Sequence, residues 1–312
     1  MRKDWDILCA GDVNIDLIVP DFQGLPSPGE EAIVSDMTLC LGGGAALTAA
    51  GAGKLGMRTA LYASSGDDPF GKSLRELLEH VGVDCSLMDY TPGTRTGITI
   101  SLTDAADRRF LTYRGSGGNF SPDRLPPEYA RRARHIHLTG YSSETHSVYM
   151  EMIRHLREED HTLTFSLDPG WDATGNWSER IFEIAAELDV LFCNETEVLH
   201  YTGEISVEQA AQKLAAHSGN IAVVKCGGRG ALACQGKEVA FVPAKEVRVV
   251  DTTGAGDSFN SGFLYGMLSG ASLKRCLAYG VFCGTATVQD YGGNTVFPSE
   301  EELLRACREE TI

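Results

Sequence analysis

The chain has 312 residues, of which 43% are hydrophobic and 22% are charged, a composition typical of globular proteins that excludes wholesale disorder. Its formal net charge of −16 predicts no nucleic-acid partner and no membrane-surface partner, because phosphate backbones and anionic lipids would be repelled. The length is sufficient for one large α/β domain or for two smaller units.

The nine cysteines are scattered along the chain and no two have the CxxC spacing, so we expect buried thiols in a reducing compartment. The first residues lack the apolar core of a signal peptide. The longest stretch without a charge, 37–53, is too rich in Gly, Ala and Thr to cross a bilayer. We therefore expect a cytoplasmic protein.

Short apolar runs alternate with helical patterns along most of the chain, which favours a mainly parallel sheet covered by helices. The predicted strands are residues 7–10, 59–63, 135–138, 163–167, 190–193 and 221–225. The predicted helices are residues 45–55, 72–80, 147–158, 179–186, 206–217, 257–269, 273–289 and 300–308. Runs at 231–234 and 239–242 are typical of a hairpin at the sheet edge. No linker or repeat is found, so we expect a single domain over residues 1–312.

Two β-type segments, at about 14–40 and 94–118, interrupt this alternation. Within the second segment, residues 98–102 and 109–113 have the composition of strands, and residues 104–107 that of a turn between them. We expect the two segments to form a small separate sheet.

Two glycine motifs match nucleotide-binding patterns but stand in the wrong context. The segment from Gly66 to Ser73 fits GxxxxGK[ST], yet Asp67 and Asp68 place negative charge in the loop and Pro69 removes an amide donor. We interpret it as the start of a helix with acidic residues at its positive end. The segment 51–56 fits GxGxxG, but it closes a predicted helix, whereas a dinucleotide site opens one.

Two histidines and two cysteines have plainer interpretations. His135 and His137 share one face of a predicted strand, but no third ligand has suitable spacing, so we favour structural histidines over a metal pair. Cys276 and Cys283 are seven residues apart on one helix face, which favours core packing over redox chemistry.

The strongest chemical signal is the segment from Asp251 to Phe259, DTTGAGDSF. Gly254–Gly256 precedes a helical pattern, so free N–H groups and the helix dipole would converge on one point and form an anion hole. Asp257 follows on the first turn. From these residues alone it could be a plain helix cap or the general base of a phosphoryl transfer.

The extended motif DTTGAGDSFNSGFLYG resembles the C-terminal signature of the ribokinase-like (PfkB-type) carbohydrate kinases, and the similarity runs along essentially the whole chain. Four further motifs agree with this family in order: GDVNID at 11–16, LGGGAALTAAGAGKLG at 41–56, NETE at 194–197 and KCGGRG at 225–230. The resemblance implies a three-layer α/β sandwich with a mainly parallel central sheet, plus a small β-sheet lid formed by segments 14–40 and 94–118. It also implies ATP, Mg²⁺ and K⁺ as cofactors and a homodimer formed through the lid.

The resemblance further implies a role for each matched residue. These are Asp257 as catalytic base; Gly254, Ala255 and Gly256 as the anion hole; Asp12, Asn14, Asp16, Gly42 and Gly43 for the acceptor; Asn194, Lys225, Gly227 and Gly230 for the nucleotide; Glu197 for Mg²⁺, through water; and Asp251 and Thr253 for a monovalent cation. The implied activity is transfer of the γ-phosphoryl group of ATP to a hydroxyl of a small sugar.

The chemical identity of the acceptor is the part of the implied function that the sequence determines least. Leu47 replaces an Asn that the family usually carries, Gly140-Tyr141 stands where ribokinases have a substrate-binding Glu, and 168–172 lacks the Asn and Arg of sugar-acid kinases. No Lys or Arg lies between Lys3 and Lys54, so we expect an unphosphorylated acceptor. The possible exceptions are the arginines of the second segment, Arg95, Arg108, Arg109 and Arg114. Alternatives are a nucleoside kinase of the same family, a catalytically silent nucleotide-binding protein and a P-loop NTPase.

Overall fold

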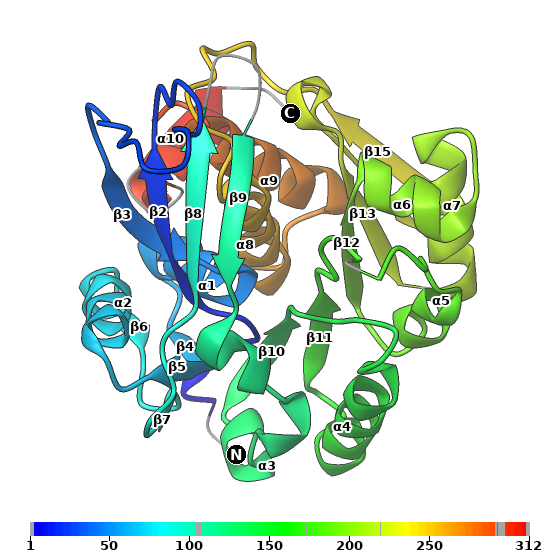
Figure 1. Ribbon diagram of the computed structural model, residues 1–312. Helices are drawn as coiled ribbons and strands as arrows, with labels where there is room; N and C mark the ends of the chain where they lie inside the picture. The colour runs from blue at the N-terminus through cyan, green and yellow to red at the C-terminus, as the bar shows by residue number, and fades with distance from the viewer. Residues whose placement is uncertain are drawn as a thin grey trace.

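The structure is a computed structural model that describes residues 3–103, 108–172, 174–218, 220–290, 292 and 297–309. In this part of the chain, a sheet of nine strands has the order β15-β14-β13-β12-β11-β10-β1-β4-β6 (Figure 1). Its strands are β1 (Trp5–Ala10), β4 (Thr59–Tyr62), β6 (Val83–Asp84), β10 (Ala133–Leu138), β11 (Thr164–Leu167), β12 (Val190–Asn194), β13 (Ile221–Lys225), β14 (Ala231–Gln235) and β15 (Glu238–Val242). The strands run parallel from β6 to β13, and β14 and β15 form the antiparallel hairpin expected at the edge.

Helices cover both faces of this sheet and make the predicted three-layer sandwich (Figure 1). Successive side chains of β1 point to opposite faces, so Leu8 packs with one group of helices while Ile7 and Cys9 pack with the other. The first group is α4 (His146–Glu159), α5 (Arg180–Ala185), α6 (Glu195–Thr202) and α7 (Val207–Ser218). The second is α1 (Gly44–Lys54), α2 (Pro69–His80), α8 (Ala255–Leu268) and α9 (Leu273–Thr287), with α10 (Glu300–Glu309) packed on α9.

The interrupting segments form a separate small sheet of order β3-β2-β8-β9, as expected from the sequence. Its strands are β2 (Asn14–Val19), β3 (Thr38–Gly42), β8 (Ile98–Thr103) and β9 (Arg108–Tyr113). Strand β3 extends two residues beyond the predicted segment, and the predicted turn at 104–107 lies outside the described residues. The small sheet stands beside the carboxyl end of β1, since β2 begins four residues after that strand ends.

Both misleading glycine motifs have the structural roles expected of them. Asp68 caps helix α2: its carboxylate accepts hydrogen bonds from the Gly71 amide at 2.9 Å and from the Thr96 hydroxyl at 2.6 Å. The segment 51–56 contains the end of α1, which is followed directly by β4. The first segment therefore opens a helix with an acidic cap, and the second closes one.

Helix α6 is a feature that the periodicity of hydrophobic residues did not predict.

The predicted histidine and cysteine roles agree with the structure. His135 and His137 are buried and both contact Ser166 Oγ, at 2.7 Å each. All nine cysteines are buried free thiols. Within the described ranges, no helix has both the length and the apolar character needed to cross a membrane.

Candidate active site

Helix α8 presents its N-terminus, and with it Asp257, at the carboxyl edge of the central sheet. Its N-cap residue Gly254 has a φ of +72°, in the left-handed region that favours glycine. The Ala255 amide donates to the Thr252 carbonyl at 3.3 Å. The amides of Gly256 and Asp257 follow in the first turn, where no intrahelical acceptor precedes them. The chain therefore offers donors and the positive end of the helix dipole to an anion at this point.

Lys225, the last residue of β13, adds a full positive charge beside these amides. Its ammonium group lies 2.5 Å from Asp168 Oδ2, and Asn260 Nδ2 donates to the same oxygen at 2.7 Å. A Cβ on Gly256 would lie 3.2 Å from Lys225 Nζ, so glycine lets the ammonium approach the helix terminus. Burial disfavours the charged ammonium, but Asp168 and the neighbouring carboxylates outweigh it and raise the pKa of Lys225 above its usual value.

The Asp257 carboxyl group has a strongly raised pKa. Burial and the neighbouring carboxylate of Asp168 raise the pKa of Asp257 to about 8, against the lowering effect of Lys225. The charge of Asp12 raises the pKa of Asp257 further. A carboxyl group that titrates near neutrality is well matched to taking a proton from a hydroxyl group.

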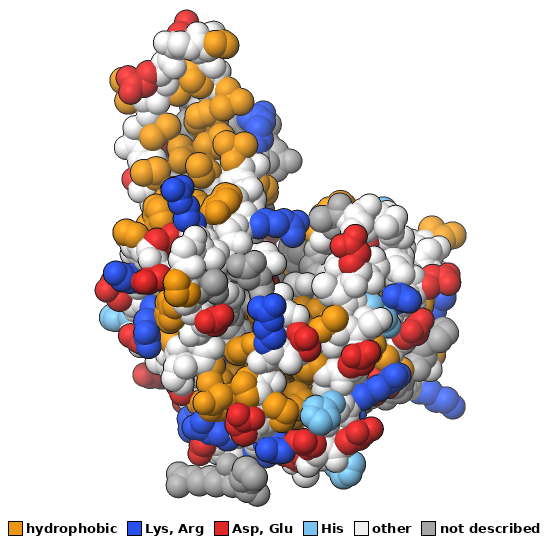
Figure 2. Space-filling model, turned by 60° about the horizontal axis from the view of Figure 1, so that its bottom comes forward, with side chains coloured by type: hydrophobic (Ala, Val, Ile, Leu, Met, Phe, Trp, Pro, Cys, Tyr) orange, Lys and Arg blue, Asp and Glu red, His pale blue; other side chains and the backbone are white. Residues whose placement is uncertain are grey.

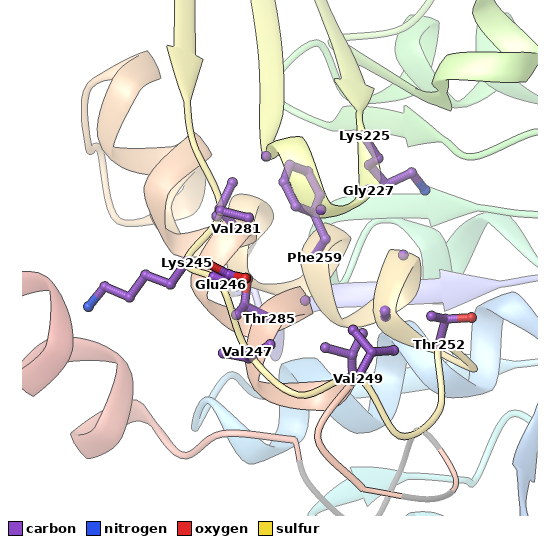
Figure 3. Close-up of a pocket in the computed structure, with 17 residues that line it drawn as sticks. Lys225, Gly227, Lys245, Glu246, Val247, Val249, Thr252, Phe259, Val281 and Thr285 are labelled. Atoms are coloured by element: carbon purple, nitrogen blue, oxygen red, sulfur yellow. The ribbon is translucent and has the colours of Figure 1, made fainter.

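A first cavity, of about 500 Å³, lies on one side of this helix terminus (Figure 3). Apolar side chains from several elements surround it, among them Val247, Val249, Phe259 and Val281, while Lys245 points away from it. Gly227 and Gly230, from the turn after β13, form part of its wall. Gly230 has a φ of +110°, and a Cβ there would lie 2.0 Å from the Val242 carbonyl oxygen, so only glycine fits. A flat apolar group joined to an anion would fit this cavity.

A second cavity, of about 950 Å³, lies on the other side and contains Asp257 in its wall. In the described part of the chain, the two cavities share two lining residues, Lys225 and Gly256. The N-terminus of α8 therefore stands where the two cavities meet. The lining of the second cavity comes mainly from the end of β1, the small sheet and the segments after β10 and β11. Its residues include Asp12, Asn14, Gly44, Thr112, Tyr113, Arg114, Phe120, Thr139, Tyr141, Glu144, Asp168, Trp171 and Asp172.

Of the residues predicted to bind the acceptor, Asp12 and Asn14 line this second cavity. The Asp12 carboxylate accepts hydrogen bonds from the Thr139 hydroxyl at 2.6 Å and from the Gly44 amide at 3.1 Å, which fixes its position. Asp16, Gly42 and Gly43 do not line this cavity.

Asp16 instead holds the Asn14 side chain through a hydrogen bond. Its Oδ1 accepts a hydrogen bond from Asn14 Nδ2 at 2.5 Å, and burial raises the pKa of Asp16 to about 7. A Cβ on Gly42 would lie 2.2 Å from Asp16 Oδ1, and one on Gly43 would lie 2.5 Å from the Asp12 carbonyl oxygen. Both glycines thus leave room for residues of this protein that surround the cavity.

The motif at 194–197 forms the N-terminal cap of α6. Asn194 Oδ1 accepts from the Glu197 amide at 2.9 Å, and Glu197 Oε2 accepts from the Asn194 amide at 2.8 Å, a reciprocal capping box. Glu197 is buried, and burial together with the charge of Asp168 raises its pKa against the lowering effect of Lys225. Glu197 is therefore electrostatically coupled to the Lys225–Asp168 pair as well as being a cap.

The predicted monovalent-cation residues lie together before α8. Asp251 is buried, and its Oδ1 accepts hydrogen bonds from the Thr253 amide at 3.0 Å and from the Thr253 hydroxyl at 2.8 Å. Its Oδ2 accepts from the Gly292 amide at 3.2 Å. The Asp251 carboxylate is an oxygen ligand of the kind that hard cations prefer, and its contacts named here are amide and hydroxyl donors.

The structure adds residues that sequence reasoning did not place in the site, above all Asp168, Thr139 and Asn260. Asp168 follows β11 and Thr139 follows β10, so both stand at the carboxyl edge of parallel strands, where open α/β sheets bind ligands. That rule could have identified them. Asn260 lies one turn into α8 and carries no such signal.

Comparison with known proteins shows the family to which the chain belongs. Residues 5–300 match the model of the pfkB family carbohydrate kinases. The chain is 28% identical over 306 residues to a nucleoside kinase of Methanothermobacter thermautotrophicus, covering 98% of this chain and 96% of that protein. It is 24% identical over 315 residues to a 5-dehydro-2-deoxygluconokinase of Bacillus licheniformis, covering 97% and 95%.

The fold is also that of a protein from E. coli whose crystal structure contains ATP and Mg²⁺, with a TM-score of 0.86, 20% identity and coverage of 98% of this chain and 100% of that one. The family match spans nearly the whole chain. The chain therefore belongs to the pfkB family of carbohydrate kinases.

Proposed function

We propose that this protein transfers the γ-phosphoryl group of ATP to a hydroxyl of a small, unphosphorylated sugar. The observation that carries the proposal is the meeting of the two cavities at Lys225 and Gly256, with Asp257 beside the meeting point. A donor in the apolar cavity and an acceptor in the polar one would face each other across the N-terminus of α8. The E. coli structure with ATP and Mg²⁺ supports the choice of donor.

The reaction follows from these positions. The adenine would occupy the apolar cavity, and the γ-phosphoryl group would lie against the α8 amides and Lys225. The acceptor oxygen attacks the γ-phosphorus in line, the bond to the ADP oxygen breaks, and Asp257 takes the hydroxyl proton. Mg²⁺, when bound, neutralises charge on the phosphates, and Glu197 with Asn194 would act on it through water. Asp251 and Thr253 would hold K⁺.

The charge of the second cavity supports an unphosphorylated acceptor. Asp12, Glu144, Asp168 and Asp172 line it, and carboxylates accept hydrogen bonds from hydroxyl groups but repel a phosphate. Arg114 and Lys225 are the basic residues in the described lining, and Lys225 is paired with Asp168. In steady-state assays, a phosphorylated sugar turned over with a higher kcat/KM than every neutral acceptor would overturn this part of the proposal.

Screening sugars, sugar acids and nucleosides for acceptor-dependent release of ADP tests the function as a whole. A nucleoside kinase is the second candidate, favoured by the volume of about 950 Å³ and by the similarity to a nucleoside kinase. Absence of ATP turnover with every acceptor tested would favour a catalytically silent nucleotide-binding protein instead.

We also propose that the small sheet is a lid, and that it joins two copies of this chain into a dimer. Large apolar side chains are exposed on it and on the connection between β2 and β3, and Figure 2 shows apolar side chains gathered on the projecting arm. They are Leu25, Ile33, Val34, Met37, Leu39, Phe110, Leu111 and Tyr113. Sedimentation of the wild type as a dimer, and of Leu111→Glu as a monomer, would support the assignment, whereas a monomeric wild type would contradict it. We further propose that the protein acts in the cytoplasm.

A further inference from the structure

The ammonium group of Lys225 is held by side chains from two other parts of the fold. Asp168, the residue after β11, places its Oδ2 at 2.5 Å from Lys225 Nζ. Asn260, from α8, donates to the same carboxylate oxygen from Nδ2 at 2.7 Å, and its Oδ1 lies 3.5 Å from Lys225 Nζ. Each of the three side chains therefore contacts the other two, and together they form a closed triangle.

Stability alone does not explain this triangle. Asn260 is fully buried, Asp168 is 9% exposed, and the Lys225 side chain is 16% exposed. A buried ion pair loses the hydration of both charges, and its replacement by well-packed apolar residues is often neutral or stabilising. An apolar pair at the ends of β11 and β13 would therefore serve the fold as well, so the charges point to a role in the site.

The triangle uses only part of the hydrogen-bonding capacity of the ammonium group. Of its three N–H donors, two are matched by the oxygens of Asp168 and Asn260. Within the described part of the chain, no other oxygen lies within hydrogen-bond distance of Lys225 Nζ, so one donor is left for a ligand. Lys225 lines both cavities, and a Cβ on Gly256 would lie 3.2 Å from its Nζ. Figure 3 shows its side chain at the margin of the apolar cavity, apart from the labelled valines.

Two further carboxylates compete for this ammonium group. Burial lowers the pKa of Lys225, whereas Asp168 raises it above the usual value. The charges of Glu197 and Asp257 raise the pKa of Lys225 further, so these carboxylates also attract the ammonium group. If Lys225 paired with Asp257, it would occupy the proposed base and leave the point where the two cavities meet.

We propose that Asp168 and Asn260 are positioning residues, which hold the Lys225 ammonium group in the path of the γ-phosphoryl group and away from Asp257. This inference rests on the proposed kinase function and adds two residues to its machinery. The γ-phosphoryl group passes from one cavity to the other with its charge spread over three oxygens. A cation fixed beside both cavities stabilises that charge throughout the transfer. Because Asp168 and Asn260 act through Lys225, their replacement should have no effect once Lys225 is itself replaced.

A double-mutant cycle tests the proposal, with initial rates of ADP formation at saturating ATP and acceptor and at pH 9. The pKa of Asp257 is about 8, so most of this carboxyl group is ionised at that pH. Lys225→Met should lower kcat by about 10²- to 10³-fold, the usual effect of removing a group that stabilises developing charge. Asp168→Asn should lower kcat by about 10- to 100-fold in the wild type, as is usual for groups that orient a ligand, and should cause no further fall in Lys225→Met. The affinity for ATP, measured by calorimetry, should change far less than kcat.

The crystal structure of ligand-free Asp168→Asn gives a readout that does not depend on activity, and it should show Lys225 Nζ displaced from Gly256. Urea unfolding checks that the variant is folded. Asp189→Asn is the matched control. The Asp189 carboxylate pairs with Arg157 at 2.7 Å at the opposite, amino end of β12, and in the described part of the chain it lines neither cavity. Its replacement should leave kcat unchanged.

Three results would overturn the inference: wild-type kcat in Asp168→Asn, a fall in kcat that is equal with and without Lys225, or a Lys225 Nζ that keeps its place in the structure of Asp168→Asn. Asn260→Ala leaves the ion pair in place and repeats the cycle if Asp168→Asn does not fold, and an equal fall with and without Lys225 would count against the inference there too. A wild-type protein that forms no ADP with any acceptor would contradict the proposed function instead, and the position of Lys225 in the variant structures would still decide the inference.

Discussion

Replacing Asp12 by asparagine should move the pH dependence of kcat/KM toward lower pH. The pKa of Asp257 is raised to about 8, by burial first and then by the charges of Asp168 and Asp12. An acid with a raised pKa is protonated below that pH, so only about one tenth of Asp257 would be an active base at pH 7. In the wild type, kcat/KM should therefore rise about tenfold per pH unit up to the inflection near 8 and level off above it.

The size of the shift follows from the position of Gly44 between the two carboxylates. The Gly44 amide donates to Asp12 Oδ2 at 3.1 Å, and a Cβ on Gly44 would lie 3.4 Å from Asp257 Oδ1. For a separation on the order of 8 Å, Coulomb's law gives about 0.5–2 kcal/mol at effective dielectric constants of about 80 to 20. One pKa unit corresponds to about 1.4 kcal/mol, so the inflection should fall by roughly 0.4–1.5 pH units.

The assay is kcat/KM for the acceptor between pH 5.5 and 9.5, at saturating ATP and constant ionic strength. Asparagine keeps the shape of Asp12 and can still accept a hydrogen bond from the Gly44 amide. A lower maximal kcat/KM in this variant would not alter the pH at which the inflection is read. Glu144→Gln removes an exposed carboxylate from the same cavity and should leave the inflection in place. A flat profile between pH 6 and 9, or an inflection that rises in Asp12→Asn, would refute the reasoning.

Three further variants test the other assignments. Asp257→Asn keeps shape but cannot take the proton, so kcat should fall by about 10²- to 10⁴-fold while ATP affinity stays nearly constant; a variant with more than half its activity would exclude Asp257 as the base. Activity should be higher in K⁺ than in Na⁺, and Asp251→Asn should abolish that difference; a preference that persists would place the cation elsewhere. Asp16→Ala frees the amide of Asn14 in the cavity wall and should raise KM for the acceptor far more than for ATP, and equal changes would contradict this.

The fold was predictable because short stretches of the sequence encode most of its strands and helices. The buried strands β1, β12 and β13 are short apolar runs, and the helices α4 and α7 show the 3.6-residue spacing of apolar positions. Helix α6 was not predicted because it is only eight residues long, and the buried set Val198, Tyr201 and Thr202 gives too few turns for a period to emerge. Its start was nevertheless encoded, since Asn194 and Glu197 have the spacing of a capping box.

The sequence indicated the candidate site most directly where one motif contains several of its parts. Gly254–Asp257 carries amides, helix dipole and carboxylate within four residues, so a helix terminus assembles them without long-range contacts. The pairing of Lys225 with Asp168 joins the end of β13 to the residue after β11, 57 positions apart in the chain, and β12 lies between the two strands. No local pattern encodes such a pair, because it depends on the strand order of the sheet. The same holds for the contact between Asp12 and Thr139, 127 positions apart.

Glu197 combines a structural and a proposed catalytic role, and two substitutions separate them. Glu197→Gln retains an oxygen that can accept from the Asn194 amide, so the cap of α6 should survive while the negative charge is lost. Glu197→Ala loses both and should lower stability by about 0.5–2 kcal/mol, the usual effect of a lost cap, measurable by urea unfolding. If Glu197 acts on Mg²⁺ through water, both variants should raise the Mg²⁺ concentration for half-maximal activity, and by similar factors. A Gln variant with the Mg²⁺ dependence of the wild type would show that the NxxE motif serves here only as a helix cap, because the capping geometry alone does not require a charge at this position.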